Sequence, residues 1–92
     1  MKTTVLNYRI IIEPERDAST GKIVYNAYAP KLGVADFGQT IEKAKEHIKE
    51  AIECYIESLL KHDDPVPEPD SSEYLISETE VTIPSNYRLT FT

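Results

Sequence analysis

The stretch from Thr40 to His62 constrains the fold most, because it is the one long segment with a clear helical period. Its apolar residues recur at steps of three and four, which places them on one face of a helix with about 3.6 residues per turn. They are Ile41, Ala44, Ile48, Ala51, Ile52, Tyr55, Ile56 and Leu59. A stripe of glutamates lies almost opposite them, at Glu42, Glu46, Glu50, Glu53 and Glu57. A helix with this pattern requires another layer of structure over its apolar face.

Both ends of this helix carry recognisable signals. Thr40 stands where an N-cap belongs, and Glu42 suits the positive end of the helix dipole. Asp63, Asp64 and Pro65 cannot continue the helix, so we expect it to end near His62, whose ring suits the negative end.

Shorter extended segments precede the helix. Alternating apolar residues predict a first strand over residues 3–13 and a second over residues 22–29. The polar run from Pro14 to Gly21 predicts a loop between them, and the simplest connection is an antiparallel hairpin. A short third strand is expected over Val34–Phe37, between two glycines.

The chain after the helix divides in two. Asp64–Glu73 is acidic and punctuated by prolines, which indicates an extended, solvated connector. Residues 78–83 and 87–91 both alternate, and the pattern allows either one kinked strand or two short ones. The predicted order is therefore β-β-β-α-β, an α+β fold in which an antiparallel sheet of three to four strands packs on one long helix.

Composition supports one small domain over residues 1–92. Within it we distinguish a β-β-β-α core (1–62), an acidic proline-rich connector (63–73) and a C-terminal strand region (74–92). A chain this short buries little surface, so a homo-oligomer, a dimer or tetramer, is expected. The single cysteine fits a reducing cytoplasm, and neither a signal peptide nor an apolar run long enough to span a membrane is evident.

The net charge of −6 is concentrated in one part of the chain. Residues 1–39 sum to +1 and residues 40–62 to −1, whereas residues 63–92 carry one arginine against seven carboxylates. Such a surface repels nucleic acid and favours a basic protein partner. Acidity that only maintains solubility is the simpler alternative.

The sequence offers little for catalysis. The only conceivable local carboxylate cluster is Asp36 with Glu42 and Glu46, and a solvated helix face explains those residues better than a two-metal site. His47 and Cys54 are about 10.5 Å apart along the helix, too far to pair. We expect Cys54 to be half-buried and His47 to lie at the surface boundary. No cofactor, metal ligand set or catalytic residue is predicted. Aromatic residues of the core or an interface are expected at Tyr8, Tyr25 and Tyr55.

The order of these segments resembles the N-terminal domain of HicB-type antitoxins. The matching positions are Gly21, Pro30, Leu32, Gly33, Gly38, Thr40, Ala44, Ala51–Leu60 and Pro65–Pro69. The resemblance covers roughly residues 4–70. It implies a partial ribonuclease-H-like fold, oligomerisation, and the binding and neutralisation of a HicA toxin, a small basic ribonuclease.

Two departures from the family pattern matter. The usual Pro-x-Leu-Pro-Gly-Cys is one residue shorter in this chain, from Pro30 to Val34, and lacks the cysteine. The tail after Pro69 is strand-like and poor in basic residues, so the DNA-binding module of many family members cannot be carried over. No direct contact of this chain with nucleic acid is expected.

These observations predict a cytoplasmic, non-enzymatic antitoxin that shields a toxin's RNA-binding surface with acidic groups. The partner-binding candidates are Asp63, Asp64, Glu68, Asp70 and Glu73, with the helix glutamates second. The alternative is a standalone oligomeric HicB-like binding or scaffold domain without a toxin. A residual nuclease is a third hypothesis.

Overall fold

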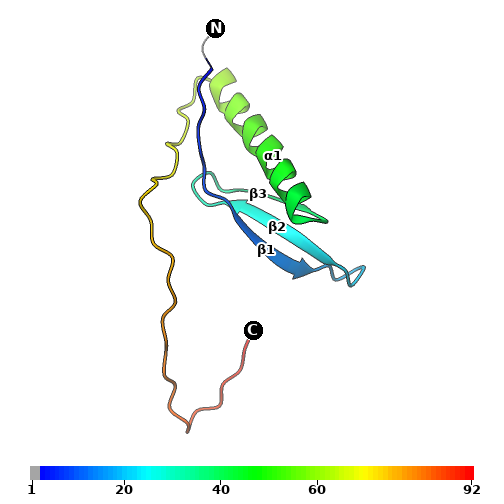
Figure 1. Ribbon diagram of the computed structural model, residues 1–92, viewed down its shortest axis with the longest axis vertical. Coiled ribbons are helices and arrows are strands. Elements are labelled where there is room, and N and C mark those ends of the chain that lie inside the picture. The colour runs from blue at the N-terminus through cyan, green and yellow to red at the C-terminus, as the bar shows by residue number, and fades with distance from the viewer. Residues whose placement is uncertain (1–2) are drawn as a thin grey trace.

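The computed structural model of the chain describes residues 3–92. Three strands come first, β1 (Ile11–Arg16), β2 (Ile23–Ala29) and β3 (Val34–Gly38), and one helix follows, α1 (Ile41–Lys61). The strands form an antiparallel sheet in the order β1-β2-β3, and α1 lies across one face of it (Figure 1). The predicted α+β class, with an antiparallel sheet packed on one long helix, is confirmed.

The core lies where the centre of the sheet meets the first half of α1. Ala27 and Ala29 of β2 are completely buried, as the alternation in this strand predicted. From the helix, Ala44 is completely buried and Ile48 is only 1% exposed. Ile48 is the one large side chain among the described residues to reach this depth, so the buried core of the single chain is small.

Two glycines allow the tight geometry around β3. Gly33 has a φ of +67°, which favours glycine, and its N–H donates to the carbonyl oxygen of Ala29 at 2.9 Å to close the β2–β3 turn. At the other end of β3, a Cβ on Gly38 would lie 2.4 Å from the backbone nitrogen of Ala44. Gly38 therefore lets the sheet approach the first turn of α1.

The helix ends are formed as predicted. The hydroxyl oxygen of Thr40 accepts a hydrogen bond from the backbone N–H of Lys43 at 3.0 Å. His62 is the C-cap, and Asp63 follows it with a φ of +55°, a conformation that aspartate tolerates better than most residues. The N–H of Asp64 then donates to the carbonyl oxygen of Leu59 at 2.9 Å.

The first strand is displaced from its predicted position. We predicted a strand over residues 3–13 and a loop from Pro14, but β1 starts at Ile11 and continues through Pro14 to Arg16. Ile11 pairs with Tyr28, next to the end of β2, so residues 3–10 run past the end of that strand and have no partner on it. Pro14 is tolerated because β1 is an edge strand.

The predicted strand after the helix is absent from the single chain. Residues 62–92 form turns and extended chain without a helix or strand, and they leave the sheet and helix as a long tail (Figure 1). The molecule consequently measures 65 × 36 × 23 Å. The alternation in this tail is that of strands, but no strand of the same chain lies beside it to complete a ladder.

Candidate functional site

The acidic exit of α1 is the first candidate surface. Asp63, Asp64, Glu68 and Glu73 are all exposed along the segment that follows the helix. The left-handed turn at Asp63 reverses the chain, which then runs back along the N-terminal segment (Figure 1). The connector therefore carries a row of accessible carboxylates past one side of the molecule.

Asp70, the fifth predicted residue, is held within the chain instead. One of its carboxylate oxygens accepts the backbone N–H of Arg9 at 2.8 Å, and the other lies 3.4 Å from the Arg9 guanidinium. The side chain of Asp70 is only 12% exposed. Asp70 is thus poorly placed for a partner and well placed to fix the tail.

Arg9 anchors the tail through two further groups, and Tyr8 adds a third contact. Its guanidinium donates to the carbonyl oxygen of Ser71 at 3.0 Å and stacks on the ring of Tyr74, 3.7 Å from the ring centroid. One residue earlier, the Tyr8 hydroxyl donates to the carbonyl oxygen of Pro67 at 2.6 Å. Burial, and then the negative charge of Asp70, raise the pKa of Tyr8, so its hydroxyl remains a donor to a higher pH than that of a free tyrosine.

Sequence reasoning missed the role of Arg9. Arg9 falls within the strand predicted over residues 3–13, and the sequence assigned it no contact. The available signal was an arginine inside an otherwise apolar run, with an acidic, aromatic-containing segment elsewhere in the chain. Its pairing with Asp70, 61 residues later, depends on the path of the tail and could not be read from spacing.

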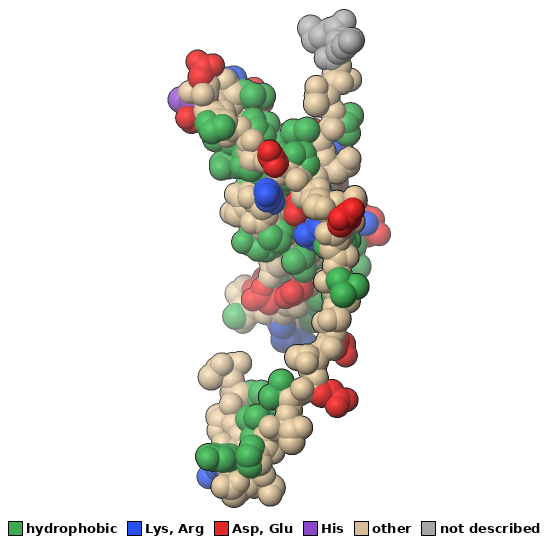
Figure 2. Space-filling view, turned by 90° about the vertical axis from the view of Figure 1, so that its left-hand side faces the viewer, with side chains coloured by type: hydrophobic (Ala, Val, Ile, Leu, Met, Phe, Trp, Pro, Cys, Tyr) green, Lys and Arg blue, Asp and Glu red, His purple; other side chains and the backbone are tan. Residues whose placement is uncertain are grey.

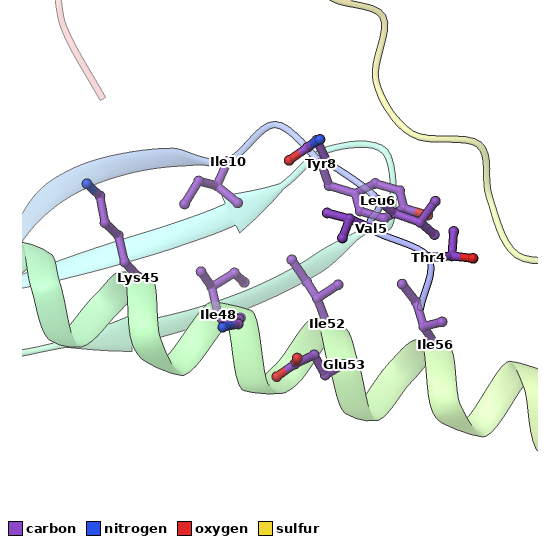
Figure 3. A pocket seen from close by; sticks show the side chains of 12 residues that line it. Thr4, Val5, Leu6, Tyr8, Ile10, Lys45, Ile48, Ile52, Glu53 and Ile56 are labelled. Atoms are coloured by element: carbon purple, nitrogen blue, oxygen red, sulfur yellow. The ribbon is translucent and has the colours of Figure 1, made fainter. Parts of the chain in front are cut away.

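An apolar groove is the second candidate surface. The C-terminal half of α1 extends past the sheet, and residues 4–10 lie opposite it across an open space (Figure 3). The space between them is about 580 Å³. Lys45, Lys49 and Glu53 lie at its edge. The apolar residues that line most of it are Val5, Leu6, Tyr8, Ile10, Ile48, Ile52 and Ile56.

The exposed face of α1 is mixed in charge. The predicted glutamate stripe is exposed, but Glu46 pairs with Lys43 at 3.3 Å and Glu57 pairs with Lys61 at 3.0 Å. Exposed pairs of this kind contribute little to stability. They also reduce the negative potential of the helix compared with the connector.

The residues considered for catalysis are not brought together. Asp36 accepts the N–H of Phe37 at 2.8 Å, and residues 3–92 contain no group of three or more His, Cys, Asp or Glu side chains able to hold a metal ion. His47, at the boundary as predicted, contacts the Phe37 carbonyl oxygen through Nδ1 at 2.6 Å. Cys54 was predicted to be half-buried, but it is exposed, because it lies on the side of α1 away from the sheet.

Of the three tyrosines predicted for the core or an interface, two are half-buried and one is exposed. Tyr8 and Tyr25 are half-buried, and Tyr25 packs against the core. Tyr55 is 37% exposed. In the part of the chain that the structure describes, no helix is long and apolar enough to cross a membrane.

The fold and these surfaces define a small α+β domain with an acidic tail. Residues 8–83 match the family described as the HicB-like antitoxin of bacterial toxin-antitoxin systems. The chain is 42% identical over 67 residues to the UPF0150 protein ssr1765 of Synechocystis, which covers 72% of the chain and 78% of that relative. It is 38% identical over 72 residues to the UPF0150 protein Ta0767 of Thermoplasma acidophilum, covering 77% and 97%. No solved structure matches.

The chain therefore belongs to the HicB-like antitoxin family, as its sequence predicted. The glycines at positions 33 and 38, on which part of that resemblance rested, now have structural reasons: one closes a turn and the other admits the helix.

Proposed function

We propose that this chain is a cytoplasmic antitoxin that binds and neutralises a small basic ribonuclease of the HicA type. The family match over residues 8–83 carries the proposal. The exposed carboxylates of the connector support it, because a ribonuclease must present a basic surface to RNA. The whole of residues 1–92 acts as one domain in this proposal, with the connector at 63–73 as the contact.

The four exposed carboxylates would pair with the toxin's RNA-binding surface and so shield its catalytic residue from substrate. Asp63, Asp64, Glu68 and Glu73 take this part. Asp70 acts through Arg9, by holding the connector in position. Complementary charge mainly accelerates association, and buried apolar contacts supply the slow dissociation. The antitoxin itself performs no reaction.

The test uses isosteric amide substitutions in the full chain. The variant Asp63→Asn, Asp64→Asn, Glu68→Gln, Glu73→Gln removes four charges and keeps the shapes, and asparagine also tolerates the left-handed turn. We expect association with a HicA-type toxin to slow by about tenfold or more at low salt and to lose most of its salt dependence. Stopped-flow binding and protection of RNA from cleavage provide the measurements.

A matched control removes the same charge from the helix. Glu42→Gln, Glu46→Gln, Glu50→Gln and Glu57→Gln should change association much less, because two of these glutamates are already paired with lysines. If the helix variant slows association as much as the connector variant, the contact is on α1. If no HicA-type toxin binds the unaltered chain, the standalone binding module becomes the better description.

A further inference from the structure

The single chain exposes far more surface than a protein of its mass should. Its accessible area is 8379 Å², whereas a compact 10.4 kDa protein exposes about 5,400 Å². Its radius of gyration is 18.1 Å, against about 12 Å for a compact chain of this length. The excess is about 3,000 Å² per chain, or about 6,000 Å² for two copies, which is more than enough to supply the roughly 2,000–5,000 Å² that an obligate dimer buries in total.

Much of this excess belongs to the C-terminal arm, which we define as residues 74–92. Its large apolar side chains are exposed, Leu75 at 90% and Phe91 at 84%. The full set is Tyr74, Leu75, Ile76, Val81, Ile83, Tyr87, Leu89 and Phe91. In Figure 2 the end of the arm is a separate lobe, with its hydrophobic atoms facing water below the main body. Water does not favour this arrangement, so the arm requires a cover.

In this structure the arm does not enter the apolar groove of its own chain. It is fixed at Tyr74 by Arg9 and leaves in the direction of β1, away from the groove at the C-terminal end of α1 (Figure 1). Val81 lies seven residues farther on, up to about 25 Å of extended chain. The arm turns back only at Pro84–Tyr87, where the N–H of Tyr87 donates to the carbonyl oxygen of Pro84 at 3.2 Å. The residues after that turn do not line the groove either.

The groove and the arm match each other in chemistry. Ile52 and Ile56 on the groove floor are half-buried, and Val5 on its other wall is 79% exposed. Val81 and Ile83 lie on one face of the extended arm, so they can enter together. The preceding Glu78 and Glu80 carry the charge opposite to that of Lys45 and Lys49, which line the groove.

We propose that the arm of one copy docks in the groove of a second copy, reciprocally, to form a closed dimer. Val81 and Ile83 fill the groove between residues 4–10 and the C-terminal half of α1, and Glu78 and Glu80 meet Lys45 and Lys49. Exchange of a terminal segment between identical chains costs little free energy, because each copy donates its arm to the partner and receives the partner's arm in return. This interface involves no toxin, so its test is independent of the function proposed above.

The first experiment measures the mass of the full chain by light scattering and sedimentation at micromolar concentration. We expect twice the 10.4 kDa of one chain. The variant Val81→Glu, Ile83→Glu should raise the dissociation constant of the dimer about a hundredfold, because it replaces two apolar side chains that the interface buries. The matched control, Thr82→Glu with Asn86→Glu, adds the same charge to the other face and to the turn, and should leave the mass unchanged.

The second experiment tests which copy provides the groove. In a Cys54→Ser background, one chain carries Ile56→Cys and another, enlarged by a tag, carries Ile83→Cys. Oxidation of the mixture should join the two chains of unequal size. Three results would each overturn the proposal. The unaltered chain could have the mass of a monomer, or both glutamate variants could lose the dimer equally. In a chain that carries both cysteines, the disulfide could form only within that chain.

Discussion

The sheet with α1 and the C-terminal arm follow the same rule of alternation, with opposite results. In β2, every second residue is apolar and points to one face of the sheet. The helix covers this face, so Ala27 and Ala29 are fully buried. In the arm, Val81 and Ile83 alternate in the same way, yet both are exposed. The difference lies in the neighbours and not in the pattern. Alternation states that a segment needs a cover, and only the tertiary structure states where the cover is.

The largest expected effect comes from removing the one large side chain that is wholly buried. Ile48→Ala should reduce the free energy of unfolding by about 2–5 kcal/mol at any protein concentration, because it leaves a cavity between α1 and β2. Leu89→Ala in the arm should cost less than about 0.5 kcal/mol at concentrations where the chain is monomeric. Urea denaturation at several protein concentrations separates the two, and equal costs in dilute solution would remove the distinction between body and arm.

A moderate effect is expected at the junction between these two regions. Arg9→Leu removes the contacts of the guanidinium to Asp70, Ser71 and Tyr74 and keeps the backbone N–H bond to Asp70, so residues 71–74 should separate from the N-terminal segment. We expect glutamyl endopeptidase to cleave after Glu73 several-fold faster, and stability to fall by about 1 kcal/mol or less, as for other partly exposed pairs.

Arg88→Leu is the control for this junction. It removes an arginine from the arm beyond the anchored part and should leave the rate of cleavage unchanged. Cleavage that is equally rapid in the unaltered chain would mean that Arg9 does not hold the connector.

The smallest effect is a pH dependence at the same junction. The pKa of Tyr8 is raised in the folded chain, chiefly by burial and then by Asp70, so the folded state retains this proton longer than the unfolded state. The resulting stabilisation is fully present at every pH below the unfolded pKa of about 10. As the pH rises through the higher folded pKa, ionisation breaks the donation to Pro67 and this contribution is lost.

The measurement is the difference in unfolding midpoint between the unaltered chain and Tyr8→Phe across this alkaline range. The unaltered chain should lose its advantage over the variant as the pH rises. A difference that stays constant would show that Tyr8 does not titrate differently in the folded chain.

The helix and the centre of the sheet could be predicted because their signals are local. Thr40, the three- and four-residue steps, and the aspartates after His62 act within a few residues of one another. The position of β1 could not be predicted, because it depends on where β2 ends, and Pro14 is a turn signal unless the strand is an edge.

The candidate surface was predicted in part. A count of charge by segment was enough to place the acidity after α1. The withdrawal of Asp70 by Arg9 and the groove beside Ile52 and Ile56 depend on contacts between residues far apart in the chain. The last strand was predicted from alternation alone, and in the single chain residues 74–92 pair with neither edge of the sheet.

Pro14 has a consequence for the solubility of a chain with so much uncovered β-forming sequence. An edge strand with a full row of free N–H and C=O groups would template the arms of successive molecules into a fibre. A proline in the middle of β1 interrupts that row, and β3, at the opposite edge, is only five residues long. Both edges are therefore poor nuclei for amyloid. The apolar arm is left to associate in closed oligomers of finite size.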